Sequence, residues 1–347
     1  MPKVTVDTTG TVPVEIYYEV HGSGPHKILF VNGMSSVAHL WDLQIDYFLK
    51  FPEFSMCIFD NRGSGLSSAP IGRYTTTLMA KDAFALLEHL GWHKDIHIVA
   101  LSMGGMIAQE LAYMLGDTIQ SMCLVSTFCK FNGVPAQLTS LTGMLKRITP
   151  HLPTMETYTC VMVDMLFQKP GLTNHVLEIP HMLQIANMQT KFFNDRLSES
   201  GFQSHAGRAG QHAAVLSHFF DERLSLLRKH KFSILIISGD QDQVVRQPVS
   251  SEYLAERLNA RLEIYPGGGH ALRFQDPDWH NRHVHDNIKA GLLIAQTSQP
   301  PDDLIKLASS LKLRDFPHHP YRPYISGSIV GNQNRSCSLF LNVLINI

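Results

Sequence analysis

A serine occupies the point where an apolar strand would turn directly into a helix. The segment VALSMGGMIAQELA, residues 99–112, places Ser102 between Ala100 and Gly104, each two positions away. Small residues at these positions leave room for the sharp, strained turn that exposes a nucleophile, and the helix N-terminus favours negative charge nearby. A structural interpretation stays open, because Gly104 and Gly105 would also let a helix and a strand pack closely.

A serine hydroxyl becomes a nucleophile only with a base, and the base needs a third group to orient it. Two later segments supply such groups at the ends of expected strands. ISGDQDQVV carries Asp240 and Asp242, and YPGGGHALRF carries His270 after three glycines. Nineteen histidines make one near a glycine-rich loop unsurprising, and strand-end aspartates often only cap helices. The order serine, acid, histidine nevertheless favours a nucleophilic triad.

Apolar strand-like runs alternate with helical patterns on both sides of a central segment. The expected strands span residues 27–33, 54–60, 95–102, 119–127, 232–239 and 261–267, after a hairpin within residues 4–20. The expected helices span residues 41–50, 77–90, 103–115, 251–258 and 277–295. Apolar strands separated by helices predict an α/β fold with a mostly parallel sheet covered on both faces.

The alternation stops over residues 130–231, where helical apolar patterns occur without a convincing strand. We expect this segment to be a helical cap, inserted between a first core part at residues 1–129 and a second at residues 232–296. Residues 297–347, rich in proline, serine and asparagine, are expected to be a disordered or loosely packed tail. His212 and His218 near the end of the cap could approach a substrate or be structural.

The expected cap is rich in methionine, a side chain that adapts to varied shapes. Its methionines include Met144, Met155, Met162, Met165, Met182 and Met188. They could line a pocket for the apolar acyl or alcohol part of a small-molecule substrate, or form the core of the cap itself.

Over residues 4–295 the chain resembles the α/β-hydrolase superfamily. The resemblance is carried by ALSMGG at the proposed turn, DNRGSGLS after the preceding strand, GDQD and GGGH. It implies the α/β-hydrolase fold, and the G-x-x-D acid turn of that family coincides with Asp242, leaving Asp240 as the alternative. The catalytic residues would then be Ser102, Asp242 and His270.

The same resemblance implies an oxyanion hole made of two backbone N–H groups. They would come from Met103, after the serine, and from Met34 in the loop after the strand at residues 27–33. Similar enzymes usually carry histidine where this chain has Asn32. Asp60 and Arg62 in DNRGSGLS are expected to brace loops beside the site.

The resemblance is closest to esterase, enol-lactonase and perhydrolase-like members. It implies a serine hydrolase without a cofactor that cleaves an ester, thioester or lactone through an acyl-enzyme. Serine at this position argues against haloalkane dehalogenases and epoxide hydrolases, which use aspartate there. Hydrolases of C–C bonds use the same three residue types and remain open. A small-ligand receptor or interaction protein that retains the triad is the alternative from another class.

Composition and spacing argue against several other functions. Lys+Arg at 29 nearly equals Asp+Glu at 30, so no broad field would attract nucleic acid or an anionic membrane. No glycine-rich phosphate loop suggests a nucleotide cofactor. No carboxylate completes a recognisable metal site with the three neighbouring histidines His280, His283 and His285. Five cysteines without a CxxC pair, no secretory signal and no long apolar run favour the cytoplasm. The oligomeric state is open.

Overall fold

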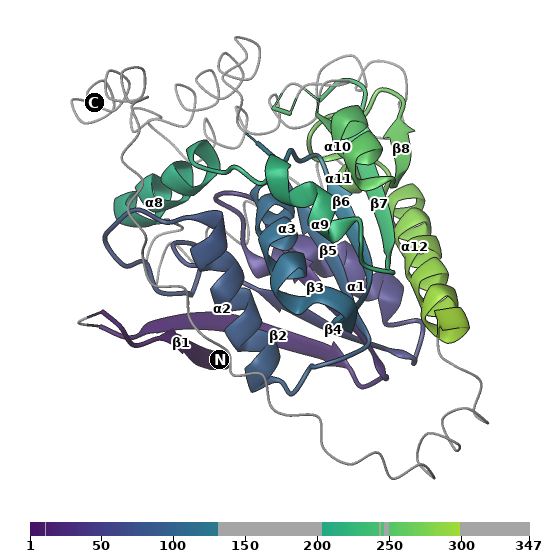
Figure 1. Ribbon diagram of the computed structural model, residues 1–347. Coiled ribbons are helices and arrows are strands. Elements are labelled where there is room, and N and C mark those ends of the chain that lie inside the picture. The colour runs from purple at the N-terminus through teal and green to yellow at the C-terminus, as the bar shows by residue number, and fades with distance from the viewer. Residues whose placement is uncertain (11, 131–202, 243, 246–249, 299–347) are drawn as a thin grey trace, which may run out of the picture. The chain divides into compact units, whose positions relative to one another are not determined.

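The apolar runs become the strands of one open sheet. The computed structural model describes residues 1–10, 12–130, 203–242, 244–245 and 250–298. Within them, eight strands pair in the order β1-β2-β4-β3-β5-β6-β7-β8 (Figure 1). The strands are β1 Lys3–Asp7, β2 Val14–Gly22, β3 His26–Val31, β4 Phe54–Phe59, β5 Ile96–Leu101, β6 Ile119–Val125, β7 Ser233–Gly239 and β8 Arg261–Tyr265. Only the pairings β1–β2 and β2–β4 among them are antiparallel.

Helices connect the strands close to where the sequence predicts them. They are α1 Asp42–Phe48, α2 Thr76–His89, α3 Met103–Leu115, α8 His205–Leu216, α9 Leu224–Leu227, α10 Ser251–Leu258, α11 Leu272–Gln275 and α12 Pro277–Ser298. Local chemistry explains two of these helix ends. The Thr75 hydroxyl accepts the Leu78 N–H at 3.0 Å at the start of α2, and Asn259 adopts the left-handed conformation after α10.

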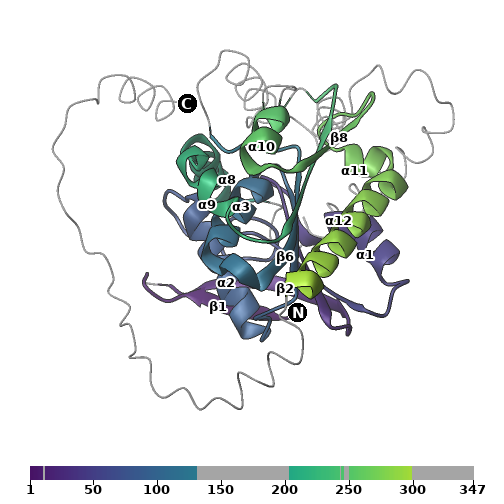
Figure 2. The same ribbon diagram turned by 45° about the vertical axis from the view of Figure 1, so that its right-hand side comes forward.

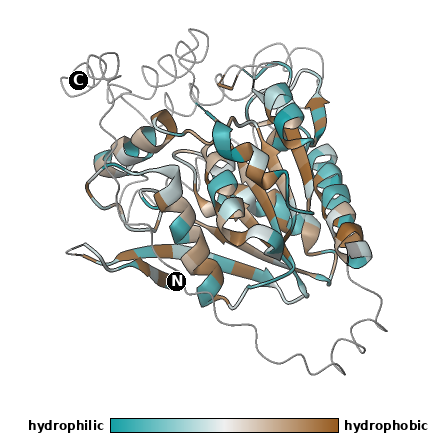
Figure 3. Ribbon diagram, viewed as in Figure 1, coloured by the Kyte–Doolittle hydropathy of each residue, from teal (hydrophilic) through white to brown (hydrophobic). Residues whose placement is uncertain are grey.

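Helices lie against both faces of the sheet (Figure 2), and an apolar cluster fills the space on each face. On one face, residues such as Leu86 of α2 and Ile107 of α3 pack against β5 and its neighbours, together with α9 and α10. On the other face, Phe48 of α1 and Ile288 of α12 pack against the same strands. Apolar residues accordingly follow the strands, while α12 is largely polar (Figure 3). The predicted fold class, a mostly parallel sheet with helices on both faces, is confirmed.

After β6 the described chain continues to Lys130 and resumes at residue 203, just before α8. Lys130 and Phe219, on either side of it, form an isolated antiparallel bridge. Residues 131–202 of the expected cap lie outside the described residues, as does the expected tail beyond residue 298. The division into cap and tail therefore stays a prediction. In the part of the chain that is described, no helix has the length and apolar character needed to cross a membrane.

Candidate active site

Ser102 forms the sharp turn between β5 and α3. Its backbone has φ 55° and ψ −120°, a conformation that a residue with a side chain adopts only under strain. The Ser102 N–H donates to the Val125 carbonyl at 2.8 Å, and the Ser102 carbonyl accepts the Thr127 hydroxyl at 2.7 Å. Strain of this kind, held by neighbouring hydrogen bonds, points to a function for the turn.

Close approach between α3 and the end of β3 explains the glycine two positions after Ser102. A β-carbon at Gly104 would lie 2.2 Å from the Val31 carbonyl oxygen, so only glycine fits there. A β-carbon at Gly33 would lie 3.3 Å from the Ser102 Cβ, which places the loop after β3 directly beside the turn.

The two residues expected to donate to an oxyanion belong to these two segments. Met103 is the first residue of α3 and is buried. Its N–H is therefore one of those at a helix N-terminus that lack an intrahelical acceptor. Met34 follows Gly33 and is partly buried. Both N–H groups thus belong to backbone beside Ser102.

Asp242 and His270 lie in the loops after β7 and β8, and both are buried. The His270 Nδ1 is 2.9 Å from the Asp242 Oδ2. Because a carboxylate only accepts, this nitrogen carries the proton and donates it. The other oxygen, Oδ1, accepts the N–H groups of Val244 and Val245, each at 2.9 Å. The carboxylate is thereby fixed with one oxygen on the imidazole.

The alternative acid has a different position. Asp240 is exposed, and its Oδ1 accepts the Gly267 N–H at 2.7 Å. Backbone bonds join the same two loops, with the Gln241 N–H donating to the Gly268 carbonyl at 2.9 Å. Asp240 therefore ties the loops together, whereas Asp242 contacts the imidazole of His270.

Topology brings Ser102, Asp242 and His270 to one edge of the sheet. They follow β5, β7 and β8, and the pairs β5–β6, β6–β7 and β7–β8 are all parallel. Carboxyl ends of parallel strands meet at the same edge, which is where open α/β sheets bind ligands. The arrangement can provide a serine nucleophile and an oriented imidazole base at one place.

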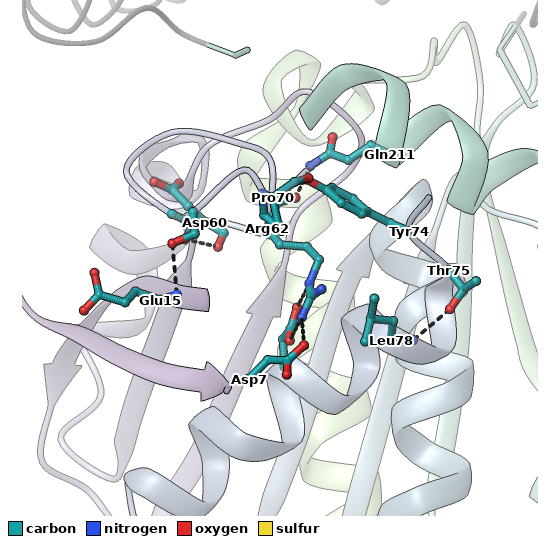
Figure 4. A network of polar contacts seen from close by, with 12 residues as sticks. Asp7, Glu15, Asp60, Arg62, Pro70, Tyr74, Thr75, Leu78 and Gln211 are labelled. Atoms are coloured by element: carbon teal, nitrogen blue, oxygen red, sulfur yellow. Dashed lines mark hydrogen bonds and ion pairs between the residues drawn. The ribbon is translucent and has the colours of Figure 1, made fainter. Parts of the chain in front are cut away.

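Buried charges brace the loop after β4 (Figure 4). Asp60 accepts the Ala38 N–H at 2.7 Å and the Leu66 N–H at 2.8 Å. Arg62 donates to both oxygens of Asp82, from Nε at 2.5 Å and from Nη2 at 2.6 Å. Burial raises the pKa of Asp82, and the guanidinium opposes that shift. Asp60 and Arg62 thus make the bracing contacts that the sequence predicts.

Two polar residues near the site were missed by the sequence reasoning. Thr127 bonds the backbone of the turn, and the buried Gln211 of α8 bonds the loops after β3 and β4. A signal for Gln211 exists, since it shares a helical face with Gly207 and Ala214 and is the polar member of that face. Asn32, where similar enzymes usually have histidine, is buried and donates to the Phe59 carbonyl at 3.3 Å.

The other histidines considered in the sequence have structural surroundings. His218 is buried with its Nδ1 3.0 Å from the Thr76 hydroxyl, and burial lowers its pKa to about 3. Burial likewise lowers the pKa of His212 to about 4. His280 contacts the Asn281 side chain, and His283 contacts the Trp279 carbonyl. Nowhere in the described residues do three His, Cys, Asp or Glu side chains form a group that could hold a metal ion.

Comparison with known proteins extends these observations. A family model described as alpha/beta hydrolase fold matches residues 27–277. A bifunctional esterase/perhydrolase of Acinetobacter calcoaceticus is 24% identical over 266 residues, covering 75% of this chain and 90% of that protein. A non-heme haloperoxidase of Rhodococcus erythropolis is 26% identical over 282 residues, covering 78% and 93%. A thermophilic esterase structure from Thermogutta terrifontis superposes with a TM-score of 0.65 at 22% identity, covering 84% of this chain and 99% of that one.

Proposed function

The chain belongs to the alpha/beta hydrolase family, and from that premise we propose that it is a serine hydrolase that cleaves a carboxylic ester, a thioester or a lactone. Ser102 is the nucleophile, His270 the general base and acid, and Asp242 the residue that orients His270. The N–H groups of Met34 and Met103 form the oxyanion hole. The reaction passes through an acyl-enzyme and needs no cofactor.

In the acylation step, the Nε2 of His270 takes the proton of Ser102 as the serine oxygen attacks the carbonyl carbon. Asp242 stabilises the imidazolium through the proton on Nδ1. The carbonyl oxygen becomes negative and accepts hydrogen bonds from Met34 and Met103. When the intermediate collapses, His270 returns the proton to the leaving alcohol, thiol or ring oxygen. Water then enters and attacks the acyl carbon while His270 takes its proton; His270 returns this proton to the Ser102 oxygen as the acid leaves.

One observation carries this proposal. A serine with φ 55° stands at a strand-to-helix turn, on the same sheet edge as a buried histidine. That histidine is bonded at 2.9 Å to a carboxylate whose other oxygen accepts two backbone N–H groups. A structural role for the turn alone would not require the Asp242–His270 pair. The names of two relatives, an esterase/perhydrolase and a 3-oxoadipate enol-lactonase, support acyl transfer from esters or lactones.

The substrate we propose is a small molecule with an apolar acyl or alcohol part, and the place of action we propose is the cytoplasm. The helix N-terminus at Met103 favours the negative charge that develops on the carbonyl oxygen of such a substrate. Neither nucleic acid nor a membrane is part of the proposal.

Labelling with a fluorophosphonate probe tests the nucleophile. Wild type, Ser102→Ala and Ser126→Ala are treated, and the adduct is located by mass spectrometry. Ser126 is the matched control because it also ends a strand with positive φ, 48°, and is buried. We expect an adduct on Ser102 in wild type and in the control, and none in Ser102→Ala. Folded wild type without an adduct would contradict the proposal.

A substrate panel then tests the class of reaction. The panel contains p-nitrophenyl esters of increasing acyl length, a thioester, lactones and carbamates, the last because a relative bears the name carbamate hydrolase. We expect turnover of esters or lactones that disappears in Ser102→Ala. Labelling of Ser102 without turnover of any of these would favour a C–C bond hydrolase or a receptor that retains the triad.

A further inference from the structure

The side chain of Gln211 is fully buried and joins three segments that are distant in sequence. Its Oε1 accepts the Ser35 N–H at 2.9 Å and the Gln203 Nε2 at 3.0 Å. Its Nε2 donates to the Arg62 carbonyl and to the Ser64 hydroxyl oxygen, both at 2.9 Å. A glutamine amide has two N–H donors and one oxygen that accepts two hydrogen bonds. Every one of these positions is used, so the amide has a single orientation.

The residue that Gln211 holds is the one that follows Met34. Ser35 has φ 55°, a left-handed conformation that residues with side chains adopt at a cost. Both its N–H and its hydroxyl are engaged, since the hydroxyl also donates to the Gln203 Oε1 at 2.7 Å. The peptide between Met34 and Ser35 is therefore fixed from outside its own loop.

The helix that carries Gln211 is itself seated tightly. A β-carbon at Gly207 would lie 2.2 Å from the Gly63 carbonyl oxygen, so α8 touches the backbone of the loop after β4. The Ser204 hydroxyl accepts the Gly207 N–H at 3.0 Å and caps the helix. The same loop is anchored by the Arg62–Asp82 pair (Figure 4). Gln211 thus transmits the position of an anchored loop to Ser35.

We infer that Gln211 is a positioning residue for the oxyanion hole. It fixes the peptide after Met34, and so holds the Met34 N–H where negative charge develops on the substrate carbonyl. This inference rests on the proposed function, because the Met34 N–H is an oxyanion donor only in a serine hydrolase. A donor that is displaced lowers kcat without weakening substrate binding in the ground state.

The test compares Gln211→Met with Gln44→Met. Methionine has a similar volume and removes all hydrogen bonds of the amide. Gln44 of α1 is the matched control, a buried glutamine whose side chain meets no hydrogen-bond partner in the described residues. For Gln211→Met we expect kcat on an ester to fall about 10-fold, less than the ~10²–10³-fold of removing a donor outright, with KM nearly constant. A boronic acid that forms a tetrahedral adduct should lose affinity by the same factor.

A second measurement does not depend on turnover. Exchange of the Ser35 amide hydrogen should accelerate in Gln211→Met and stay at the wild-type rate in Gln44→Met. Should Gln211→Met not fold, Gln203→Met serves instead, because Gln203 is partly exposed and bonds both Gln211 and Ser35. Its kcat should fall about threefold, since the direct bond from Ser35 to Gln211 remains.

Unchanged Ser35 exchange, or unchanged kcat in an active enzyme, would overturn the role of Gln211 alone. An equal loss of kcat in Gln44→Met would do the same, because it would show a general effect of changing a buried glutamine. Failure of the proposed function looks different, since wild type would then neither react with the fluorophosphonate nor hydrolyse an ester.

Discussion

On one side of Ser102, the acid and the histidine are held by the loops that carry them. Asp242 accepts the N–H groups of Val244 and Val245, and the loops after β7 and β8 bond each other through backbone. On the other side, the loop that carries Met34 is held by side chains from distant elements. Asp60 comes from the loop after β4, and Gln211 comes from α8.

This difference in support separates the groups proposed to react from the groups that hold the loops in place. The acid–histidine side consists of groups that would react or orient, supported by short local contacts. The opposite side, called the network side below, consists of buried polar side chains that bond one another or the backbone of nearby loops, namely Asp60, Arg62, Asp82 and Gln211. Buried polar groups are costly when a partner is lost. Substitutions on the acid–histidine side should therefore remove activity with little change in the free energy of unfolding. Substitutions on the network side should mainly lower the free energy of unfolding.

The largest effect is expected for Asp242→Asn. An asparagine there can stabilise the wrong imidazole tautomer and cannot stabilise the imidazolium, so kcat should fall by about 10⁴. Asp240→Asn is the control, because that side chain is exposed and bonds only the loop backbone, and its kcat should stay within about threefold. Steady-state kinetics on an ester, with the melting temperature of each variant, checks this. A larger loss in Asp240→Asn than in Asp242→Asn would reverse the assignment.

The next effect concerns stability on the network side. Arg62→Met leaves the buried Asp82 carboxylate without its bidentate partner, and the free energy of unfolding should drop by about 3–5 kcal/mol. Arg261→Met is the control, since Arg261 and Glu263 form a more exposed pair at 3.4 Å and should contribute about 0–1 kcal/mol. Denaturant unfolding measures both. Equal losses in the two variants would contradict the distinction between the sides.

The same distinction explains which site residues could be predicted from the sequence and which could not. Ser102, Asp242 and His270 belong to short motifs at strand ends, and local spacing with the apolar periodicity suffices to find the motifs and the sheet. The structure then distinguishes Asp242 from Asp240 by their contacts. Gln211 escapes such reasoning because its partner Ser35 is 176 residues away, and a contact at that distance depends on how α8 packs. The same holds for Thr127, whose hydroxyl reaches back to the turn.

Asp60→Asn makes on the network side the same aspartate-to-asparagine change that Asp242→Asn makes on the acid–histidine side. The carboxylate accepts two backbone N–H groups, from Ala38 and Leu66, one on each oxygen. Asparagine offers one oxygen, so one of these donors faces an NH2 group, and the free energy of unfolding should drop by about 1–3 kcal/mol. Asp240→Asn should stay within about 0.5 kcal/mol. Thermal unfolding of both variants measures these losses. An equal shift in melting temperature would mean that the two sides respond alike to this substitution.

The smallest expected effect is a dependence of the free energy of unfolding on pH that comes from His218. His218 follows α8, the helix that carries Gln211, and bonds Thr76 at the start of α2; burial lowers its pKa to about 3 from 6.5. The unfolded chain therefore binds a proton below pH 6.5 that the folded chain refuses, so its contribution to stability is complete above pH 6.5 and is lost as pH falls toward 3. Between pH 5.5 and 4.5 wild type should lose roughly 1.4 kcal/mol more than His218→Asn, which keeps a polar partner for Thr76 without titrating. Urea unfolding at several pH values measures the two slopes. Parallel slopes would mean that His218 titrates alike in the folded and unfolded chain, and the acid sensitivity of the fold would then have to reside in other groups.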